Sequence, residues 1–312
     1  MSLLVSGSLA YDRIMDFPGN FADHIIPEKA HVLSVSFSVS GMVEKFGGTA
    51  GNIAYGLSQL GERPLVLSTI GKDYQRYFEW LRKNKISTAC IKIVEDEFTA
   101  GAYITTDHAD NQITAFNPGA MKFATEFKFD GVDLSNALAI VAPGNIQDMM
   151  SFAVVYKKKG VPYVFDPGQS IPALTPEEII KGIEGSMLLI ANDYEMELIQ
   201  RMTGLGLSNL LKMTGAAIVT KGERGSVVHI NDGDVVVPAV KPKEVKDPTG
   251  AGDAYRAGLL KGLVEGEDLV ASARMGAVCA AYAVETYGTQ EYRFTLPEFR
   301  LRYQESFGGV KD

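Results

Sequence analysis

Short, wholly apolar runs alternate with segments of helical pattern over the second half of the chain. Runs of this kind are typical of parallel strands that are buried on both faces. Because the segments between them have the apolar spacing of helices, the pattern predicts a doubly wound, mostly parallel α/β sheet flanked by helices. The strands are expected at residues 3–6, 137–142, 163–165, 187–191, 216–220 and 226–230, and the helices at 148–159, 176–184, 194–203 and 269–284.

A different pattern occupies two other regions of the chain. Residues 33–40 alternate strictly between an apolar residue and Ser, which predicts a strand with one apolar and one polar face. Residues 100–106 and 112–116 are also expected to be strands, and residues 107–111 between them are rich in Asp and Asn, as hairpin turns are. These regions predict a small sheet apart from the main body, which is either a meander on the edge of the core or a lid.

The composition excludes classes of partner more than it identifies one. A chain of 312 residues buries a large core, and its net charge of −8 attracts neither nucleic acid nor an anionic membrane surface. A local group of N–H donors still binds phosphate whatever the total charge. Cys90 and Cys279 are too few for a disulfide framework, which favours the reducing cytoplasm. Residues 1–10 lack a basic leader and no apolar run approaches a membrane span, so we expect a soluble protein without a signal peptide.

The stretch that carries the most chemistry is DPTGAGD at residues 247–253, which runs directly into a helical pattern. The small residues Gly250, Ala251 and Gly252 let the backbone approach a ligand closely. The unpaired N–H groups and the positive dipole end of the following helix form an anion site, and the dipole favours an ionised carboxylate at Asp253. An anion cradle beside a fixed carboxylate suits the transfer of a phosphoryl group to a hydroxyl. The alternative is an ordinary Asp-rich turn before a helix.

Residues 247–258 resemble the second signature of the ribokinase/adenosine kinase (PfkB) family. The segment FGGTAGNIA at 46–54, with the later Leu60-Gly61 and IGKD at 70–73, is similar to the first signature. The Walker lysine pattern and the Rossmann fingerprint are absent, which disfavours a dehydrogenase. The resemblance covers nearly the whole chain and is strongest to the archaeal and bacterial nucleoside kinases. It implies a ribokinase-like fold, with a large domain over 1–12, 44–96 and 119–312 and a small β-sheet lid over 13–43 and 97–118.

The resemblance also implies a set of substrate contacts. Asp12, which we place just past the first strand, is either a solvated turn residue or a ligand of two sugar hydroxyls, and Phe37 and Phe116 either stack on a base or pack the lid. Gln112 or Gln169 would contact the edge of the base. The implied substrate-binding residues are Asp12, Gly47, Gly48, Asn52, Gln112, Phe116, Asn145, Asp166 and Gln169.

ATP and Mg²⁺ are the implied cofactors, and K⁺ is a further one. Glu195 of the motif Asn192-x-x-Glu195 would orient water around Mg²⁺, although acidic residues there also suit a helix N-terminus. The turn at 220–225 is either a plain hairpin or a nucleotide contact. The implied nucleotide-binding residues are Asn192, Thr220, Lys221, Gly222 and Gly225, and the residues of a monovalent cation loop are Asp247, Thr249 and Gly288, where Gly288 also suits a helix C-cap.

These residues predict a kinase for the 5′-hydroxyl of purine nucleosides, namely inosine, guanosine or adenosine. Asp253 would act as the base and Gly250–Gly252 as the anion hole. The alternatives are a kinase for ribose or a fructose-like sugar and a nucleotide sensor without catalytic activity. An exposed face of the lid sheet would favour a homodimer, because such a face is costly to leave bare.

Overall fold

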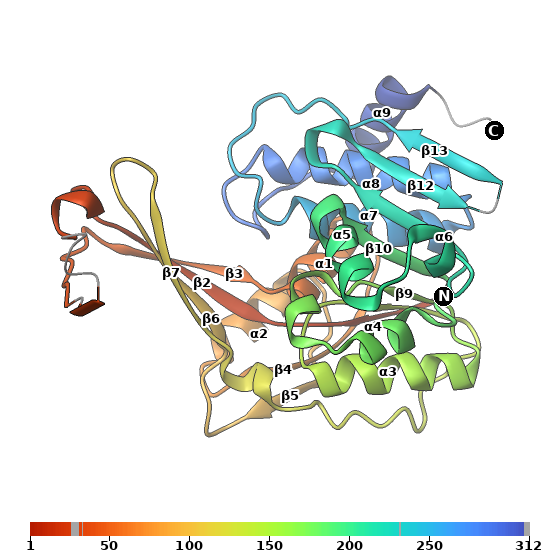
Figure 1. Ribbon diagram of the computed structural model, residues 1–312, viewed down its shortest axis with the longest axis horizontal. Helices are drawn as coiled ribbons and strands as arrows, with labels where there is room; N and C mark the ends of the chain where they lie inside the picture. The colour runs from red at the N-terminus through yellow and green to blue at the C-terminus, as the bar shows by residue number, and fades with distance from the viewer. Residues whose placement is uncertain (26–30, 33, 231, 309–312) are drawn as a thin grey trace.

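The computed structural model describes residues 1–25, 31–32, 34–230 and 232–308, and its centre is a large, mostly parallel sheet (Figure 1). The order of its strands is β13-β12-β11-β10-β9-β8-β1-β4-β5. Neighbours from β11 to β5 pair in parallel, whereas β12 and β13 complete one edge as antiparallel strands. The strands are β1 (Ser2–Ser6), β4 (Leu65–Gly71), β5 (Ile91–Val94), β8 (Ala137–Val141), β9 (Tyr163–Phe165), β10 (Leu188–Asn192), β11 (Ala217–Thr220), β12 (Ser226–Ile230) and β13 (Gly233–Val237).

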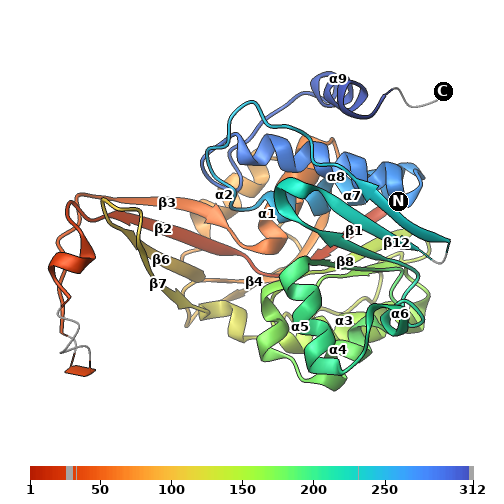
Figure 2. The ribbon, with the colours of Figure 1, turned by 45° about the horizontal axis from the view of Figure 1, so that its top comes forward.

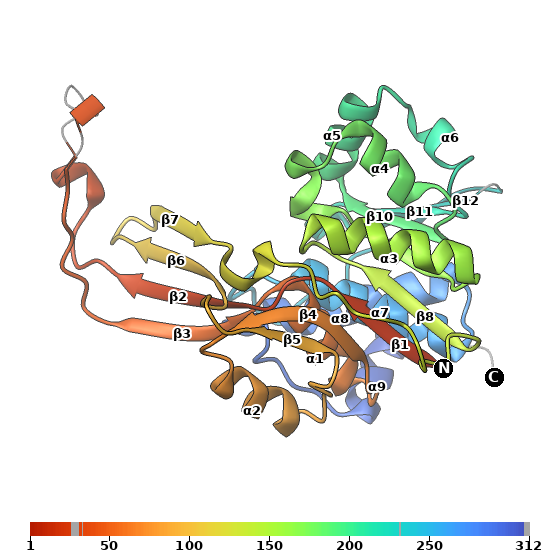
Figure 3. The same cartoon turned by 90° about the horizontal axis from the view of Figure 1, so that it is seen from below.

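Helices cover both faces of this sheet because successive strand residues point to opposite sides. In β10, Leu188 and Ile190 enter one buried cluster, and Leu189 and Ala191 enter the other. Figure 3 shows α3, α4, α5 and α6 on one side and α1, α2, α7, α8 and α9 on the other. The helices are α1 (Thr49–Gln59), α2 (Gln75–Lys83), α3 (Ile146–Lys159), α4 (Pro176–Ile183), α5 (Asp193–Thr203), α6 (Leu207–Leu210), α7 (Ala251–Glu265), α8 (Leu269–Val284) and α9 (Leu296–Phe307).

The doubly wound fold is confirmed, and the expected strands and helices of the second half lie within two residues of their predicted bounds. Capping residues define where helix α3 begins and ends. Asn145 caps α3 by accepting the N–H of Asp148, and Gly160 ends that helix in the left-handed conformation. No helix in the described part of the chain is long and apolar enough to cross a membrane. Cys90 and Cys279 are both free thiols.

A separate four-stranded sheet projects from the main body (Figures 1 and 2). Its order is β3-β2-β6-β7, from β2 (Ala10–Asp16), β3 (Met42–Gly47), β6 (Ala100–Thr106) and β7 (Gln112–Asn117). The turn at 107–111 is as expected, and Asp107 accepts the N–H groups of Ala109 and Asn111 there. Strand β2 begins at Ala10 and strand β3 runs to Gly47, so these two strands extend across the domain boundaries that we expected between residues 12 and 13 and between residues 43 and 44.

The strand expected at residues 33–40 was wrong for the residues that the structure describes. Residues 34–40 form no strand, and Leu33 lies outside the described residues. The alternation of burial holds only over residues 34–38, where Val35 and Phe37 are half-buried and the serines exposed, because Val39 is exposed. Phe37 packs on Phe17 with ring centroids 4.9 Å apart, in a cluster that also holds Phe21 and His24. The period-2 pattern therefore serves an aromatic cluster and not a hydrogen-bonded ladder.

Candidate active site

Helix α7 begins where the sequence predicts, at a glycine with a positive φ. Gly250 is the N-cap with φ 77°, and a Cβ at this position would lie 2.8 Å from the Thr289 side chain. Backbone of this kind favours glycine, and the close approach of Thr289 excludes a side chain here. The N–H groups of Gly252 and Asp253 donate no hydrogen bond to another described residue. The first turn of α7 therefore presents free donors to the solvent.

Two other helix N-termini at the same edge are closed by the protein itself. In α1, Ser8 accepts the N–H groups of Thr49 and Ala50. In α5, a capping box closes the N-terminus, because Asn192 accepts the N–H of Glu195 and Glu195 accepts the N–H of Asn192. The start of α7 differs from these two ends because its Gly252 and Asp253 N–H groups have no partner among the described residues, as an anion site would require.

Asp253 lies in the first turn of α7, where its Oδ2 accepts a hydrogen bond of 2.7 Å from Nδ2 of Asn52. Burial raises the pKa of this carboxyl to about 6, and the charges of Asp166 and Glu195 act in the same direction. The charge of Arg256 and the hydrogen bond from Asn52 act against this rise. The loss of solvation thus outweighs the favourable helix dipole on which the sequence argument relied, but a carboxyl with a pKa of about 6 is still largely ionised at neutral pH, as that argument expected.

Arg256, one turn further along α7, forms a buried ion pair with Asp166. Its Nη2 donates to Oδ1 of Asp166 at 2.6 Å, its Nε donates to Oδ2, and its Nη1 donates to the carbonyl of Gly252 at 3.0 Å. Burial alone would lower the pKa of Arg256, but the charges of Asp166, Asp253 and Glu195 raise it. Asp166 is 1% exposed with both oxygens occupied, so we propose that it positions Arg256 and the start of α7. The sequence argument gave Arg256 no role.

A cavity of about 190 Å³ lies in front of α7 and gathers most of the residues expected to handle phosphate. Its walls come from the carboxyl ends of β9, β10 and β11 and from the start of α7, the edge where open α/β sheets bind ligands. The lining residues that the sequence analysis expected are Asp166, Gln169, Asn192, Glu195, Thr220, Gly250, Gly252 and Asp253. The lining residues that it did not expect are Thr49, Pro143, Gly168 and Arg256.

A second cavity of about 740 Å³ adjoins the first one and shares Pro143 and Gln169 with it. Phe116 of β7, which is 51% exposed, forms one side. Asn145, which also caps α3, lines it as well. A volume of this size is within the range of about 300–1,000 Å³ that is usual for small-molecule sites. Phe116, Asn145 and Gln169 therefore meet at one cavity as expected, whereas Phe37 lies in the aromatic cluster described above.

Other expected substrate residues lie outside the linings of these two cavities. Asp12 was expected just past the first strand, but it lies within β2, in register with Lys45 and Ala102. Burial raises its pKa, and the charge of Asp247 adds to that rise. A Cβ at Gly47 would lie 2.5 Å from Oδ2 of Asp12, so the glycine leaves room for that carboxylate. Gly48 is the N-cap of α1 with φ 86°. Gln112 is exposed at the start of β7.

The turn between β11 and β12 lies beside the start of α5. It is an antiparallel hairpin that contains Lys221, Gly222 and Gly225, with Gly222 at φ 57° and Gly225 at φ 82°. Arg224 in this turn donates to Asp193 of α5 at 2.7 Å. The expected nucleotide contacts therefore lie near Asn192 and Glu195. Burial raises the pKa of Glu195, and the hydrogen bond from Asn192 opposes this rise.

The residues expected to hold a monovalent cation come together through backbone donors. Asp247 accepts the N–H of Thr249 at 2.9 Å and the N–H of Gly288 at 3.1 Å. Gly288 was expected to suit the C-cap of α8, but the helix ends at Val284 and its cap is Glu285. Its positive φ of 92° serves the following loop instead. In the described part of the chain, no group of three or more His, Cys, Asp or Glu side chains offers a complete metal cage.

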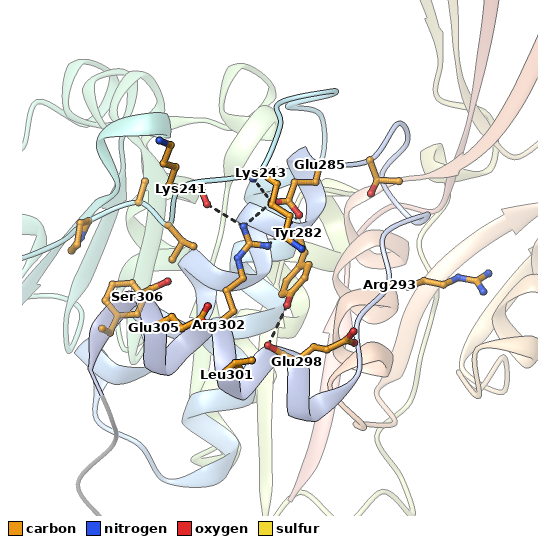
Figure 4. Close-up of a pocket in the computed structure, with 15 residues that line it drawn as sticks. Lys241, Lys243, Tyr282, Glu285, Arg293, Glu298, Leu301, Arg302, Glu305 and Ser306 are labelled. Carbon is orange, nitrogen blue, oxygen red and sulfur yellow. Dashed lines mark hydrogen bonds and ion pairs between the residues drawn. The ribbon is translucent and has the colours of Figure 1, made fainter.

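A further cavity of about 760 Å³ lies away from these residues, between residues 238–243, the end of α8 and α9 (Figure 4). Arg302 crosses it and donates to Glu285 at 2.7 Å and to the carbonyl of Lys241 at 3.1 Å. Its guanidinium lies 4.4 Å from the ring centroid of Tyr282. These contacts tie α9 to α8, and none of the residues expected in the site lines this cavity.

The fold and the site together define a ribokinase-like phosphotransferase that acts on hydroxyl groups. Residues 12–294 match the pfkB family of carbohydrate kinases, and the chain belongs to this family. A nucleoside kinase of Methanocaldococcus jannaschii is 34% identical over 266 residues, which are 84% of this chain and 87% of that protein.

Solved structures agree with this assignment. The nucleoside kinase of Burkholderia thailandensis in complex with inosine is 37% identical, with a TM-score of 0.87 and coverage of 99% of both chains. The same enzyme in complex with ADP-inosine has a TM-score of 0.85 at 37% identity and covers 100% of this chain and 99% of its own. The large sheet, the flanking helices and the small separate sheet are thus those of the ribokinase-like fold.

Proposed function

We propose that this protein is an ATP-dependent kinase that phosphorylates the 5′-hydroxyl of purine nucleosides such as inosine, guanosine or adenosine. The observation that carries the proposal is the start of α7, where Gly252 and Asp253, whose N–H groups have no partner in the described part of the chain, line one cavity. The similarity to the inosine-bound kinase of Burkholderia thailandensis supports the nucleoside as acceptor. The adjoining cavity of about 740 Å³, with Phe116 on its wall, offers an aromatic surface for a base.

In this proposal the nucleoside hydroxyl oxygen attacks the γ-phosphorus of ATP while the bond from that phosphorus to the β–γ bridging oxygen breaks. Asp253 accepts the hydroxyl proton late in the transfer, and ADP leaves. The N–H groups of Gly252 and Asp253 stabilise the charge that develops on the phosphoryl oxygens. A carboxyl with a pKa of about 6 is largely ionised at neutral pH and is a stronger base than an ordinary Asp.

The nucleotide would lie along the β11–β12 turn, with Asn192, Thr220, Lys221, Gly222 and Gly225 near its phosphates. Mg²⁺ prefers to keep several water ligands, which fits a site that offers Glu195 rather than a full set of carboxylates. When bound, Mg²⁺ would neutralise phosphate charge, and Glu195 would hold its water. The loop of Asp247, Thr249 and Gly288 is the proposed place for K⁺, and turnover that is independent of K⁺ would contradict this part.

Turnover on a panel of acceptors tests the proposal. ATP consumption should require Mg²⁺ and should proceed with inosine, guanosine or adenosine, and Asp253→Asn should lose at least about 100-fold in kcat while still binding ATP. Near-normal turnover of Asp253→Asn would refute the base role. The second candidate is a sugar kinase, which the family assignment favours, and turnover only with ribose or fructose would establish it. ATP binding without turnover on any acceptor would leave a nucleotide sensor.

A homodimer formed through the small sheet is a further part of the proposal. Met42, Val43, Ile113 and Phe116 are all exposed on this sheet, by 57%, 52%, 45% and 51%. Met42 and Ile113 lie on one face of the sheet and Val43 and Phe116 on the other, so each face carries exposed apolar side chains, which favours a covered surface. In sedimentation experiments the wild type should be a dimer and Val43→Glu should be a monomer. A monomeric wild type would contradict the proposed homodimer.

A further inference from the structure

A chain of buried hydrogen bonds leads from Asp253 through Asn52 to three side chains that the proposed reaction does not use. Asn52, which donates to Asp253, accepts at Oδ1 from Nε2 of Gln290 at 3.0 Å. The same Nε2 donates to the phenol oxygen of Tyr77 at 2.8 Å. Oε1 of Gln290 accepts from Nε1 of Trp80 at 2.9 Å. Gln290 is 1% exposed, so water does not compete for these bonds.

The two ends of this chain fix its direction. An indole N–H can only donate, so Trp80 requires the oxygen of the Gln290 amide. The hydroxyl of Tyr77 donates to the carbonyl of Gly47 at 2.7 Å, which leaves its oxygen to accept from Gln290. Both partners therefore demand the same orientation of the Gln290 amide, with its NH₂ group toward Asn52. Asn52 must then present its oxygen to Gln290 and its NH₂ group to Asp253.

Thr289 does not impose this orientation. Its hydroxyl lies 2.8 Å from Oδ1 of Asn52 and 3.0 Å from the carbonyl of Phe46. If the Asn52 amide were reversed, Thr289 would donate to Phe46 and accept from Asn52, and it would lose nothing. A reversed Asn52 would place an amide oxygen against the carboxylate of Asp253, which is repulsive. Gln290 and the ionised carboxylate of Asp253 therefore select the same orientation of Asn52, and Gln290 selects it whether or not Asp253 is ionised.

The side chains and backbone around Gln290 lie close to it. A Cβ at Gly51 of α1 would lie 2.1 Å from the Tyr77 hydroxyl and 2.9 Å from Nε2 of Gln290. Trp80 is held by the ring of Phe46, with centroids 5.0 Å apart and planes 10° from parallel. The positions of the Gln290, Tyr77 and Trp80 side chains are thus supported by contacts that lie away from the cavity.

We propose that Gln290 is a positioning residue of the reaction, which orients the Asn52 amide so that it donates to Asp253 and holds that carboxylate as the acceptor of the substrate proton. The inference rests on the base role proposed for Asp253. It adds a residue that lies 37 positions after Asp253 in the sequence but only two hydrogen bonds away from it.

The charges around Asp253 allow a specific measurement. Arg256 on α7, Asp166 after β9, Glu195 on α5 and the buried phenol of Tyr292 are the titratable groups coupled to it. Gln290→Leu changes none of these charges. If Asn52 loses its fixed orientation, the ionised form of Asp253 loses a donor, and its pKa rises by about 0.5–1 pH unit. The acid limb of kcat/KM against pH should move upward by the same amount.

The experiment compares Gln290→Leu with a matched control. Tyr163→Phe removes a buried hydroxyl that donates to the carbonyl of Gly182 at 3.0 Å, in the opposite cluster of the core. Gln290→Leu should lower kcat/KM about two- to fivefold near pH 6 and little at pH 8. Tyr163→Phe should leave the profile in place. The ¹³C carboxyl titration of Asp253, assigned by its loss in Asp253→Asn, should show the same shift without any substrate.

The outcomes separate the inference from the proposed function. Trp80→Phe alone should shift the titration less than Gln290→Leu, because Tyr77 still orients the amide. Trp80→Phe with Tyr77→Phe should restore the full shift, and this pair decides the matter if Gln290→Leu does not fold. A loss of stability with an unmoved Asp253 titration would overturn the positioning role. Normal turnover by Asp253→Asn would refute the base role, while the titration would still decide whether Gln290 orients Asn52.

Discussion

Asp253→Asn is expected to stabilise the folded chain while it abolishes turnover. Burial raises the pKa of Asp253 from an ordinary 3.8 to about 6. A carboxyl whose folded pKa lies above its unfolded pKa contributes its full stability below the unfolded value and loses it as the pH rises through the folded value. For this shift, the ionised carboxylate costs about 1 kcal/mol at pH 4.5 and about 3 kcal/mol at pH 8. The amide of the variant carries no charge at either pH.

The free energy of unfolding in urea should therefore favour Asp253→Asn over the wild type by about 2 kcal/mol more at pH 8 than at pH 4.5. Asp133 provides the control, because the hydroxyl and N–H of Ser135 lower its pKa. Asp133→Asn should show the opposite dependence on pH. A difference between Asp253→Asn and the wild type that stays constant from pH 4.5 to pH 8 would refute the reasoning.

Two further predictions concern the same group of charges. The wild-type kcat/KM should rise with pH through a midpoint near about 6, since only the ionised form of Asp253 accepts a proton, and an acid limb near pH 4 would contradict the raised pKa. Arg256→Met leaves Asp166 buried without a partner, so the free energy of unfolding should fall by about 3–5 kcal/mol at pH 8. Burial raises the pKa of Asp166, and removing the charge of Arg256 raises it further, so the loss should be smaller at pH 5 than at pH 8, and equal losses in urea at both values would contradict this account.

The central strands β1, β8, β9, β10 and β11 of the large sheet were predictable because they are buried on both faces, whereas the strands β5 and β13 at its edges are partly exposed and were not predicted. That burial requires an unbroken apolar run, as at Tyr163–Phe165, and a run of this kind is visible in the sequence. The small sheet was harder, because its strands are exposed on one side and carry polar residues. Residues 34–40 alternate as a strand does, yet their partners are aromatic rings from elsewhere in the chain. Local alternation does not say whether a neighbouring strand exists.

The site divides in a similar way. Residues 250–253 were predictable as an anion site because a glycine-containing helix start can be recognised from a few neighbouring positions in the sequence. The roles of Arg256 and Gln290 were not, because they come from contacts with Asp166 and Asn52, which are far away in the sequence. The pKa of Asp253 belongs to the same class. It is set by what surrounds the carboxyl in the fold, and a reference value for Asp cannot contain that.

The open N-terminus of α7 has a consequence for the kinetics of nucleotide capture. Its donors are uncharged amides whose attraction for phosphate acts over a few ångströms, within a chain whose net charge is −8. A nucleotide that approaches from bulk solvent therefore meets repulsion first and attraction only on arrival. Added salt screens the distant repulsion more than the near contact. Moderate ionic strength should accordingly speed nucleotide association with this protein, the reverse of its effect on proteins that attract phosphate with a basic surface.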